Sequence, residues 1–350
     1  MGVKFFFALC VFIVLLPRIT LANVIVKTDD RIELFALLQL LHDDTNPYVL
    51  DSKYKRDVLK EFRKWRKHPA VKAIATLQKQ YSGYYTLAGE FGTCTEWRSD
   101  SLCWLPTSTT FRQLDPLNSD SLLSLCNHFI RQSGYRNWMS RNELRMSTWS
   151  SNFQNALSQT KVYDQLFMLI RNEQRRIYLF LSPLNSWGAY NVWCNQTTLN
   201  DSAIVLIYGF VDIQKSSRKS EPDFTNRTML QTTFWHEVLH SYVNPLVRSK
   251  LKGWSLNPKA ETLRSNASRN FTFTLEGALN EAWVRATVVV LLEKFIGDEA
   301  AAKELQKQQV NFGFDLEELF ILLKQKTTSS NNLNVAWVDA MNVWDPTREY

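Results

Sequence analysis

Apolar residues recur at helical spacing directly after a long hydrophobic run at the N-terminus. Asp30 and Glu33 precede most of these apolar positions with the three-residue separation of a capping box. We therefore expect the folded chain to open with a helix. The apolar stripe of this helix comprises Ile32, Leu34, Leu37, Leu38 and Leu41.

Similar patterns predict further helices in the N-terminal third and in the C-terminal half. The first of them ends before Pro69, since a proline disfavours helical backbone in the residue that precedes it. The predicted helices cover residues 53–65, 71–81, 228–243, 275–296, 300–309 and 316–324.

Two short segments in the middle of the chain are rich in β-branched and aromatic residues. Residues 176–182 and 203–210 are bounded by turn-forming residues, which is typical of strands, and they are close enough in sequence to pair directly. The sequence thus predicts an α+β fold, with a small mixed or antiparallel sheet, helices on one side of that sheet and a helical C-terminal part.

The N-terminus has the features of a secretory signal peptide. Lys4 precedes an apolar run from Phe5 to Leu16, and Ala22 offers a cleavage site. Twelve apolar residues are too few to span a bilayer, which takes about 20. We expect a signal peptide at residues 1–22, a secreted protein without a membrane span, and one domain over residues 23–350.

Composition and charge exclude several classes of protein. With 45% hydrophobic and 21% charged residues, the chain has the composition of a globular domain. Eight basic residues between Lys53 and Lys67 are interpreted as a solvated helix face, and a secretory signal argues against a nucleic-acid partner. The 12 tryptophans would suit a carbohydrate-binding surface, although core packing is the preferred interpretation.

Cysteines and glycosylation sequons fit an oxidising compartment. Cys10 leaves with the signal peptide, so four cysteines remain, and an even number favours two disulfides. We expect Cys94 to pair with Cys103 and Cys126 with Cys194, although spacing alone leaves three connectivities open. Candidate glycosylation sites are Asn195, Asn200, Asn226, Asn266 and Asn270.

The segment from His236 to His240 has the pattern HExxH within a predicted helix. Residues four apart lie on one helix face, so both imidazoles can bind one zinc ion. Glu237 lies beside that face, where it can act as general base toward a zinc-bound water molecule. A chance match to this pattern is the alternative.

A catalytic zinc site needs a third protein ligand. No histidine follows His240, and His42, His68 and His128 lie upstream in contexts that favour structural roles. Glu281 is the preferred candidate, because its helix face is apolar and a bare carboxylate there would be costly.

Two other residues complicate the assignment of Glu281. Glu276 is the next candidate ligand on the same predicted helix. Arg285 lies one turn after Glu281 and could form an ion pair with it, in place of the metal or together with it.

These motifs resemble a family of zinc metallopeptidase-like proteins catalogued as a domain of unknown function. The resemblance rests on residues 30–34, 67–69, 236–245 and 281–286 and extends over nearly the whole chain after residue 22. It implies a zincin-like fold, with Glu281 as the third ligand of one zinc ion. Arg285 departs from related glutamate-ligated zincins, which carry an acid or serine shortly after the ligand glutamate.

The sequence therefore predicts a secreted zinc metallopeptidase that hydrolyses peptide bonds in a peptide or protein substrate. The endo mode is slightly preferred. Tyr242 and Tyr208 are candidate donors to a developing oxyanion. The alternatives are an inactive zinc-binding protein and a carbohydrate-binding secreted protein.

Overall fold

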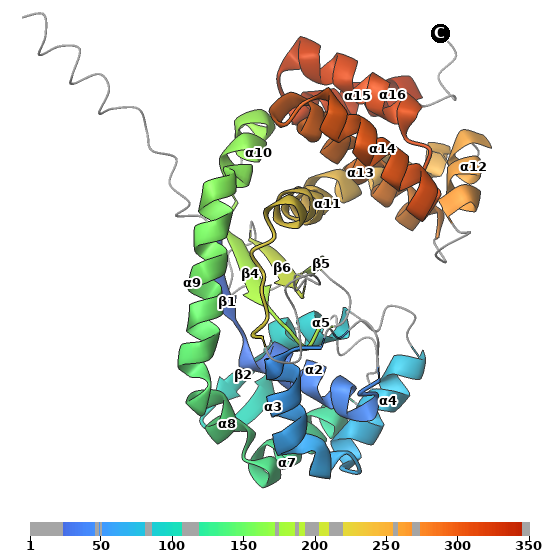
Figure 1. The fold of residues 1–350 in the computed structure, drawn as a ribbon. Coiled ribbons are helices and arrows are strands. Elements are labelled where there is room, and N and C mark those ends of the chain that lie inside the picture. Colours follow the sequence, from blue (N-terminus) through green and yellow to red (C-terminus); the bar gives the residue numbers. More distant parts are fainter. Residues whose placement is uncertain are drawn as a thin grey trace, which may run out of the picture.

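The structure of the protein is a computed structural model. It describes residues 24–45, 49, 51–80, 86–106, 119–171, 175–185, 189–192, 203–209, 220–254, 258–267 and 274–344. The fold is mixed α and β and mostly helical, with a small sheet and a helical C-terminal part (Figure 1). The expected α+β class is thus confirmed.

The main sheet has four strands in the order β1-β4-β6-β5. β1, β4 and β6 are parallel, and β5 is antiparallel to β6 at one edge, so the sheet is mixed. The two predicted strands correspond to β4 and β6 and do pair directly. The strands are β1 (Val24–Thr28), β4 (Ile177–Leu181), β5 (Ala189–Val192) and β6 (Ile204–Tyr208).

One face of the sheet is covered by helix α5 (Leu87–Cys94). A Cβ atom on Gly89 would lie only 2.7 Å from side-chain atoms of Ile207 and Val192, so this close approach requires glycine. The backbone N–H of Gly89 also donates a hydrogen bond to the hydroxyl of Tyr190 at 3.1 Å. Helix α2 (Asp30–His42) packs against α5.

The opposite face is covered by α9 (Glu143–Thr160) and α11 (Arg227–Trp254). The ring of Phe153 on α9 contacts that of Tyr208 on β6, with centroids 4.9 Å apart. The expectation of helices on one side only is therefore wrong. Parallel strands need crossover connections, and these place helices on both faces of the sheet.

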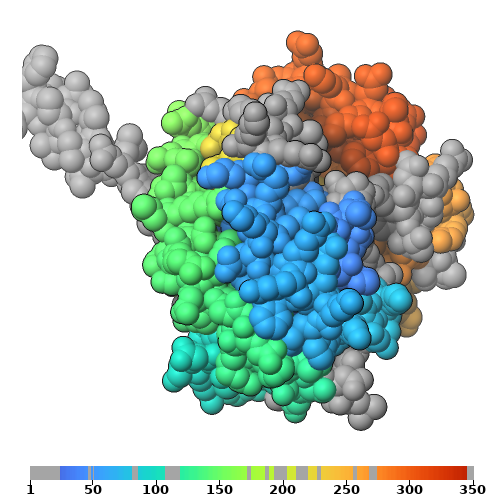
Figure 2. All heavy atoms as spheres, turned by 60° about the horizontal axis from the view of Figure 1, so that its bottom comes forward, coloured from blue at the N-terminus to red at the C-terminus, as the bar shows by residue number. Residues whose placement is uncertain are grey.

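The N-terminal half is built of short helices and one hairpin, β2 with β3. In Figure 2, the N-terminal helices and the α8 to α9 region lie side by side on one face of the molecule. The elements are α2 (Asp30–His42), α3 (Lys53–Phe62), a 3-10 turn (Arg63–Trp65), α4 (Pro69–Gln80), β2 (Thr95–Arg98), β3 (Ser101–Trp104), α7 (Ser119–Ser133), α8 (Tyr135–Arg141) and α10 (Val162–Ile170).

The start of the described chain differs from the expectation. Strand β1 precedes the first helix, so a strand and not a helix opens the fold. The side chain of Asp29 caps α2 by accepting a hydrogen bond from the backbone N–H of Arg31 at 2.9 Å. Glu33 does not close a capping box, because its carboxyl group lies in the core and accepts a hydrogen bond from Tyr54.

The C-terminal helices gather beyond α11 in Figure 1. Trp254 at the end of α11 stacks on Trp283 at a centroid distance of 5.8 Å, and Trp344 meets Trp254 edge-on at 5.0 Å. All three tryptophans are buried, so they act as core residues. The helices are α12 (Pro258–Ala267), α13 (Leu275–Phe295), α14 (Asp298–Phe312), α15 (Glu317–Ser330) and α16 (Leu333–Trp344).

The expected signal peptide at residues 1–22 lies outside the described residues. Among the helices that the structure does describe, we find none with the length and apolar character required to cross a bilayer.

Candidate metal centre

The two histidines of the HExxH segment lie in the middle of α11. The helix continues well past the expected end at residue 243, although Pro245 lies inside it. Pro245 lacks an N–H group, so the carbonyl group of Ser241 loses its usual helical donor one residue after the second histidine.

Helix α13 supplies the acidic side chain that faces these histidines. Its first turn is capped by Thr274, whose hydroxyl accepts a hydrogen bond from the backbone N–H of Gly277 at 3.0 Å. The helix then packs along α11. Glu281 lies two turns into α13 and points at the histidines of α11.

Three side chains converge on one point between the two helices. The Nε2 atoms of His236 and His240 are 3.1 Å apart. An oxygen of Glu281 lies 3.6 Å from His236 Nε2, and the other lies 3.4 Å from His240 Nε2. The ligand atoms of all three lie within 4.8 Å of one another, which is close enough to bind a single ion.

Asn244 orients the second histidine. Its Oδ1 lies 3.0 Å from Nδ1 of His240, one helical turn away. A carbonyl oxygen accepts a hydrogen bond, so Nδ1 carries a proton and Nε2 is the nitrogen that can bind a metal ion once its own proton has been displaced. This tautomer is the one that a metal ion requires, and it was not predicted from the sequence.

The charges at this point favour a cation. Burial raises the pKa of Glu281, but Arg285 and the two histidines outweigh it and hold that pKa well below its usual range. Burial lowers the pKa of His240, but the neighbouring Glu281 carboxylate raises it to about 9. A proton is thus held where the three side chains meet, and a bound metal ion would take its place.

Glu237 is buried beside the two histidines, with 8% of its surface exposed. Burial raises the pKa of its carboxyl group to about 8. Asn191 of β5 donates hydrogen bonds to the backbone carbonyl of Glu237 at 3.1 Å and to the hydroxyl of Ser241 at 2.5 Å. The edge strand therefore holds the turn of α11 that carries the HExxH glutamate.

Arg285 contacts the same carboxylate oxygen of Glu281 that lies 3.6 Å from His236. Its Nε donates to the carboxylate at 2.8 Å, and its Nη1 donates to Oε1 of Gln308 on α14 at 2.5 Å. The rings of Phe312 and Phe314 lie 4.6 and 5.2 Å from the guanidinium. The predicted ion pair forms, and it coexists with the contacts from both histidines to Glu281.

A cavity of about 540 Å³ opens onto these groups. Its walls come from β5, α11, α13 and α14 and from the residue before α5. The side chains that line it are Thr86, Ala189, Tyr190, Asn191, Thr232, Thr233, His236, Glu237, His240, Asn244, Glu281, Arg285, Val288, Glu304, Lys307, Gln308 and Phe312.

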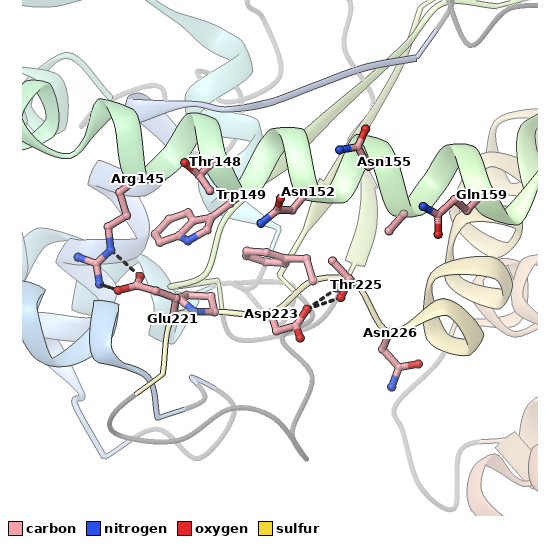
Figure 3. A pocket seen from close by; sticks show the side chains of 13 residues that line it. Arg145, Thr148, Trp149, Asn152, Asn155, Gln159, Glu221, Asp223, Thr225 and Asn226 are labelled. Carbon is pink, nitrogen blue, oxygen red and sulfur yellow. Dashed lines mark hydrogen bonds and ion pairs between the residues drawn. The ribbon is translucent and has the colours of Figure 1, made fainter.

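A larger hollow of about 1030 Å³ lies elsewhere, between α9 and the segment from Glu221 to Asn226 (Figure 3). Its charged side chains already have partners within the fold. Arg145 donates to both carboxylate oxygens of Glu221, at 2.6 and 2.9 Å, and Asp223 accepts from the hydroxyl of Thr225 at 2.6 Å. Among the residues that the structure describes, the side chains lining this hollow form no metal-binding cluster.

Three candidate residues lie away from the point where the histidines and Glu281 meet. They are Tyr242, Tyr208 and Glu276. Tyr242 faces away from the cavity and stacks on Trp337 of α16 at 6.4 Å. Tyr208 is buried in the core against Phe153. Glu276 accepts from Nε of Arg248 at 2.9 Å and does not line the cavity.

The upstream histidines also lie outside the cavity. Nδ1 of His68 accepts a hydrogen bond from the backbone N–H of Ala70 at 3.1 Å, and its Nε2 lies 3.1 Å from Nδ1 of His128. His42 is exposed at the end of α2. His68 therefore has the structural role that the sequence predicted.

The disulfide scheme stays a prediction. Cys103 and Cys126 are not bonded to another cysteine within the part of the chain described, and Cys194 lies outside it. The register of β2 and β3 places Cys103 opposite Glu96, whereas the carbonyl of Cys94 accepts a hydrogen bond from Leu105.

The glycosylation sites also stay predictions. Asn226, before α11, and Asn266, in α12, are half-buried. Asn195, Asn200 and Asn270 lie outside the described residues.

Comparison with known proteins places the chain in a family. A family model described as "Domain of unknown function (DUF4932)" matches residues 110–332, which is more than half of the chain. The chain belongs to this family. The matched stretch of the DUF4932 member contains His236, Glu237, His240 and Glu281. No curated protein and no solved structure matches the chain.

Proposed function

We propose that this protein is a zinc-dependent peptidase in which Glu237 acts as general base. The convergence of His236, His240 and Glu281 on one point carries the proposal. Two histidines and a glutamate, brought together from two helices, are a donor set of catalytic zinc sites.

The protonation states of the site fit a metal ion as well as the distances do. Asn244 keeps a proton on Nδ1 of His240, so that Nε2 can bind a metal ion which displaces the proton held at the centre. Glu281 is ionised, since Arg285 and the histidines stabilise its charged form. Zinc bound here would supply Lewis-acid chemistry, by lowering the pKa of a water molecule to ~7 and polarising a carbonyl group.

Glu237 supplies the proton transfer. Its position next to His236 in α11 places its carboxylate beside the metal ligands, and it lines the same cavity. As a base it would take a proton from the attacking water, and as an acid it would pass that proton to the leaving amine. Asn191 keeps this turn of α11 at a constant position relative to β5.

An edge strand in the cavity wall supports a peptide substrate. Strand β5 lies at the edge of the sheet and contributes Ala189, Tyr190 and Asn191 to the cavity wall. An extended peptide can add to such an edge through main-chain hydrogen bonds, which would place its backbone beside the metal ligands. Secretion and a zincin-like fold are part of the same proposal.

Metal analysis and a peptide library test the proposal together. The purified full-length protein should contain about one zinc ion per chain and cleave peptides, and both properties should disappear after chelation and return with added zinc. A protein that binds zinc and cleaves nothing in the library would be the inactive zinc-binding alternative. A protein that binds no zinc, even when zinc is added, would contradict the proposed centre.

A further inference from the structure

Two cationic side chains line the cavity next to the metal-binding groups. Arg285 comes from α13 and Lys307 from α14. Arg285 is bonded to the carboxylate of Glu281 at 2.8 Å, and Lys307 lines the same cavity as the two histidines. They therefore lie near the place where the reacting part of a substrate would be bound.

A chain of contacts holds these two cations in neighbouring positions. Arg285 donates to Gln308 at 2.5 Å, and Gln308 in turn donates to Glu304. The ammonium group of Lys307 lies 3.0 Å from each oxygen of Glu304. Since Glu304, Lys307 and Gln308 belong to one stretch of α14, this helix holds Lys307 in the cavity wall near Arg285 of α13.

Both cations have donors left for a ligand. Within the described residues, Nε and Nη1 of Arg285 have acceptors, whereas Nη2 has none. Lys307 contacts a single carboxylate and is about half exposed, with 47% of its side-chain surface accessible. An ammonium group has three donors, so further acceptors can bind to it.

The charges in the cavity favour a negatively charged ligand once a metal is bound. Three carboxylates line it, from Glu237, Glu281 and Glu304, and the only cations on its wall, among the residues described, are Arg285 and Lys307. A divalent metal ion adds two positive charges, so the net charge of the cavity becomes positive. The β5 wall is uncharged and the charges from α13 and α14 balance, so the excess positive charge comes from the metal ion, next to Arg285 and Lys307.

We propose that the cavity selects peptides with a carboxylate group beside the scissile bond, and that Arg285 and Lys307 bind this carboxylate. The inference rests on the proposed peptidase function and names the substrate class of the same site. The carboxylate has two sources, the C-terminus of the substrate or an aspartate or glutamate side chain. Both offer the same planar acceptor to the guanidinium and the ammonium.

Matched peptides test the inference and distinguish the two sources. In the first set, each peptide that has a free C-terminal carboxylate is compared with the same peptide as its C-terminal amide. In the second set, glutamate is compared with glutamine at each position around the cleaved bond. The zinc-loaded protein should cleave the carboxylate member of one set with a kcat/KM about tenfold higher, mainly through a lower KM, as for a charge-assisted hydrogen bond.

Lys307→Gln should remove most of that preference and leave zinc content unchanged. Lys303→Gln is the matched control, because Lys303 is exposed on the same helix but does not line the cavity. Equal cleavage of both members of both sets, or a preference that survives in Lys307→Gln, would overturn the inference.

Binding measurements separate this inference from the peptidase proposal. Fluorescence anisotropy can measure how tightly labelled acid and amide peptides bind to the zinc-loaded Glu237→Gln variant. The same measurement is then made on the double variant that also carries Lys307→Gln. Tighter binding of the acid that depends on Lys307 would support the carboxylate site even if no peptide is cleaved. Binding that is equal for acid and amide would overturn it even if the protein is an active peptidase.

Discussion

The carboxyl group of Glu33 accepts a hydrogen bond from the hydroxyl of Ser182, which joins the first helix to the residue after β4. Its second oxygen accepts from the hydroxyl of Tyr54 at 3.0 Å. Glu33 is fully buried, and burial raises its pKa from 4.5 to about 7. A buried carboxyl group whose pKa is raised in the folded state makes the free energy of unfolding depend on pH.

We expect the contribution of Glu33 to the stability of the protein to decrease as the pH rises from about 4.5 to 7. The folded state binds the Glu33 proton more tightly than the unfolded state does, so its contribution is complete below the unfolded pKa and disappears above the folded one. The loss would be about 3 kcal/mol at ~1.4 kcal/mol per pKa unit.

Glu33→Gln should remove this contribution, because an amide is neutral at every pH and can still bond to Ser182 and Tyr54. The measurement is denaturant unfolding of both proteins between pH 4 and 8. The variant should gain stability relative to the wild type as the pH rises. Parallel curves for the two proteins would show that Glu33 does not titrate in this range.

Glu237→Gln should separate catalysis from metal binding. Glutamine keeps the size of the side chain and leaves both histidines in place, but it cannot accept the proton. Zinc content and the thermal midpoint should stay close to wild type, while peptide hydrolysis falls by ~10²–10⁴-fold. His236→Ala should lose zinc and activity together. Wild-type rates in the Glu237→Gln variant would refute the mechanism.

Glu281→Ala should weaken zinc binding far more than Glu276→Ala. Glu281 lies within 3.6 Å of both histidine Nε2 atoms, whereas Glu276 is bound to Arg248 outside the cavity. Competition with a calibrated chelator gives the two zinc affinities. If the two variants retain zinc equally, Glu281 is not the third ligand.

Asn244→Ala should reduce zinc affinity by ~10–100-fold, since an outer contact that orients a ligand histidine has effects of this size. A cobalt-substituted protein would report the same change as an altered visible absorption spectrum. Asn342→Ala is a suitable control, because Asn342 accepts a hydrogen bond from Lys250 and does not line the cavity. Equal affinities in these two variants would mean that Asn244 does not set the tautomer of His240.

Much of the candidate site could be predicted from sequence because it rests on local geometry. The HExxH pattern places two histidines on one helix face whatever surrounds the helix. Glu281 was predicted because an acid among apolar neighbours needs a cation. The orientation of Tyr242 was not predicted, because it depends on α16, which packs against the far side of α11.

Apart from Asn244, which lies one helical turn from His240, the residues that sequence reasoning missed act across long distances in the chain. Asn191 reaches α11 from β5, and Gln308 reaches Arg285 from α14. Nothing in the local pattern of either segment marks an amide as a contact for a metal centre. The amides become recognisable only when the strand and the helices are packed together.

The fold was predicted in class but not in arrangement. Residues 177–181 and 204–208 were expected to form strands, and they do. Their parallel pairing was not foreseen, and neither was the pairing of β4 with β1, which lies more than a hundred residues earlier in the chain. The antiparallel strand β5 is short and polar at Asn191, so its pattern does not stand out from a loop.

A metal ion bound at this centre would act as a cross-link within the protein. Its ligands come from α11 and α13, which are separated along the chain by α12. The ion would bind strongly only when these helices are packed together, so it would stabilise the native state by RT ln(1 + [Zn]/Kd). Zinc supply would then control how long the protein survives as well as whether it is active, and a chelator would promote its unfolding.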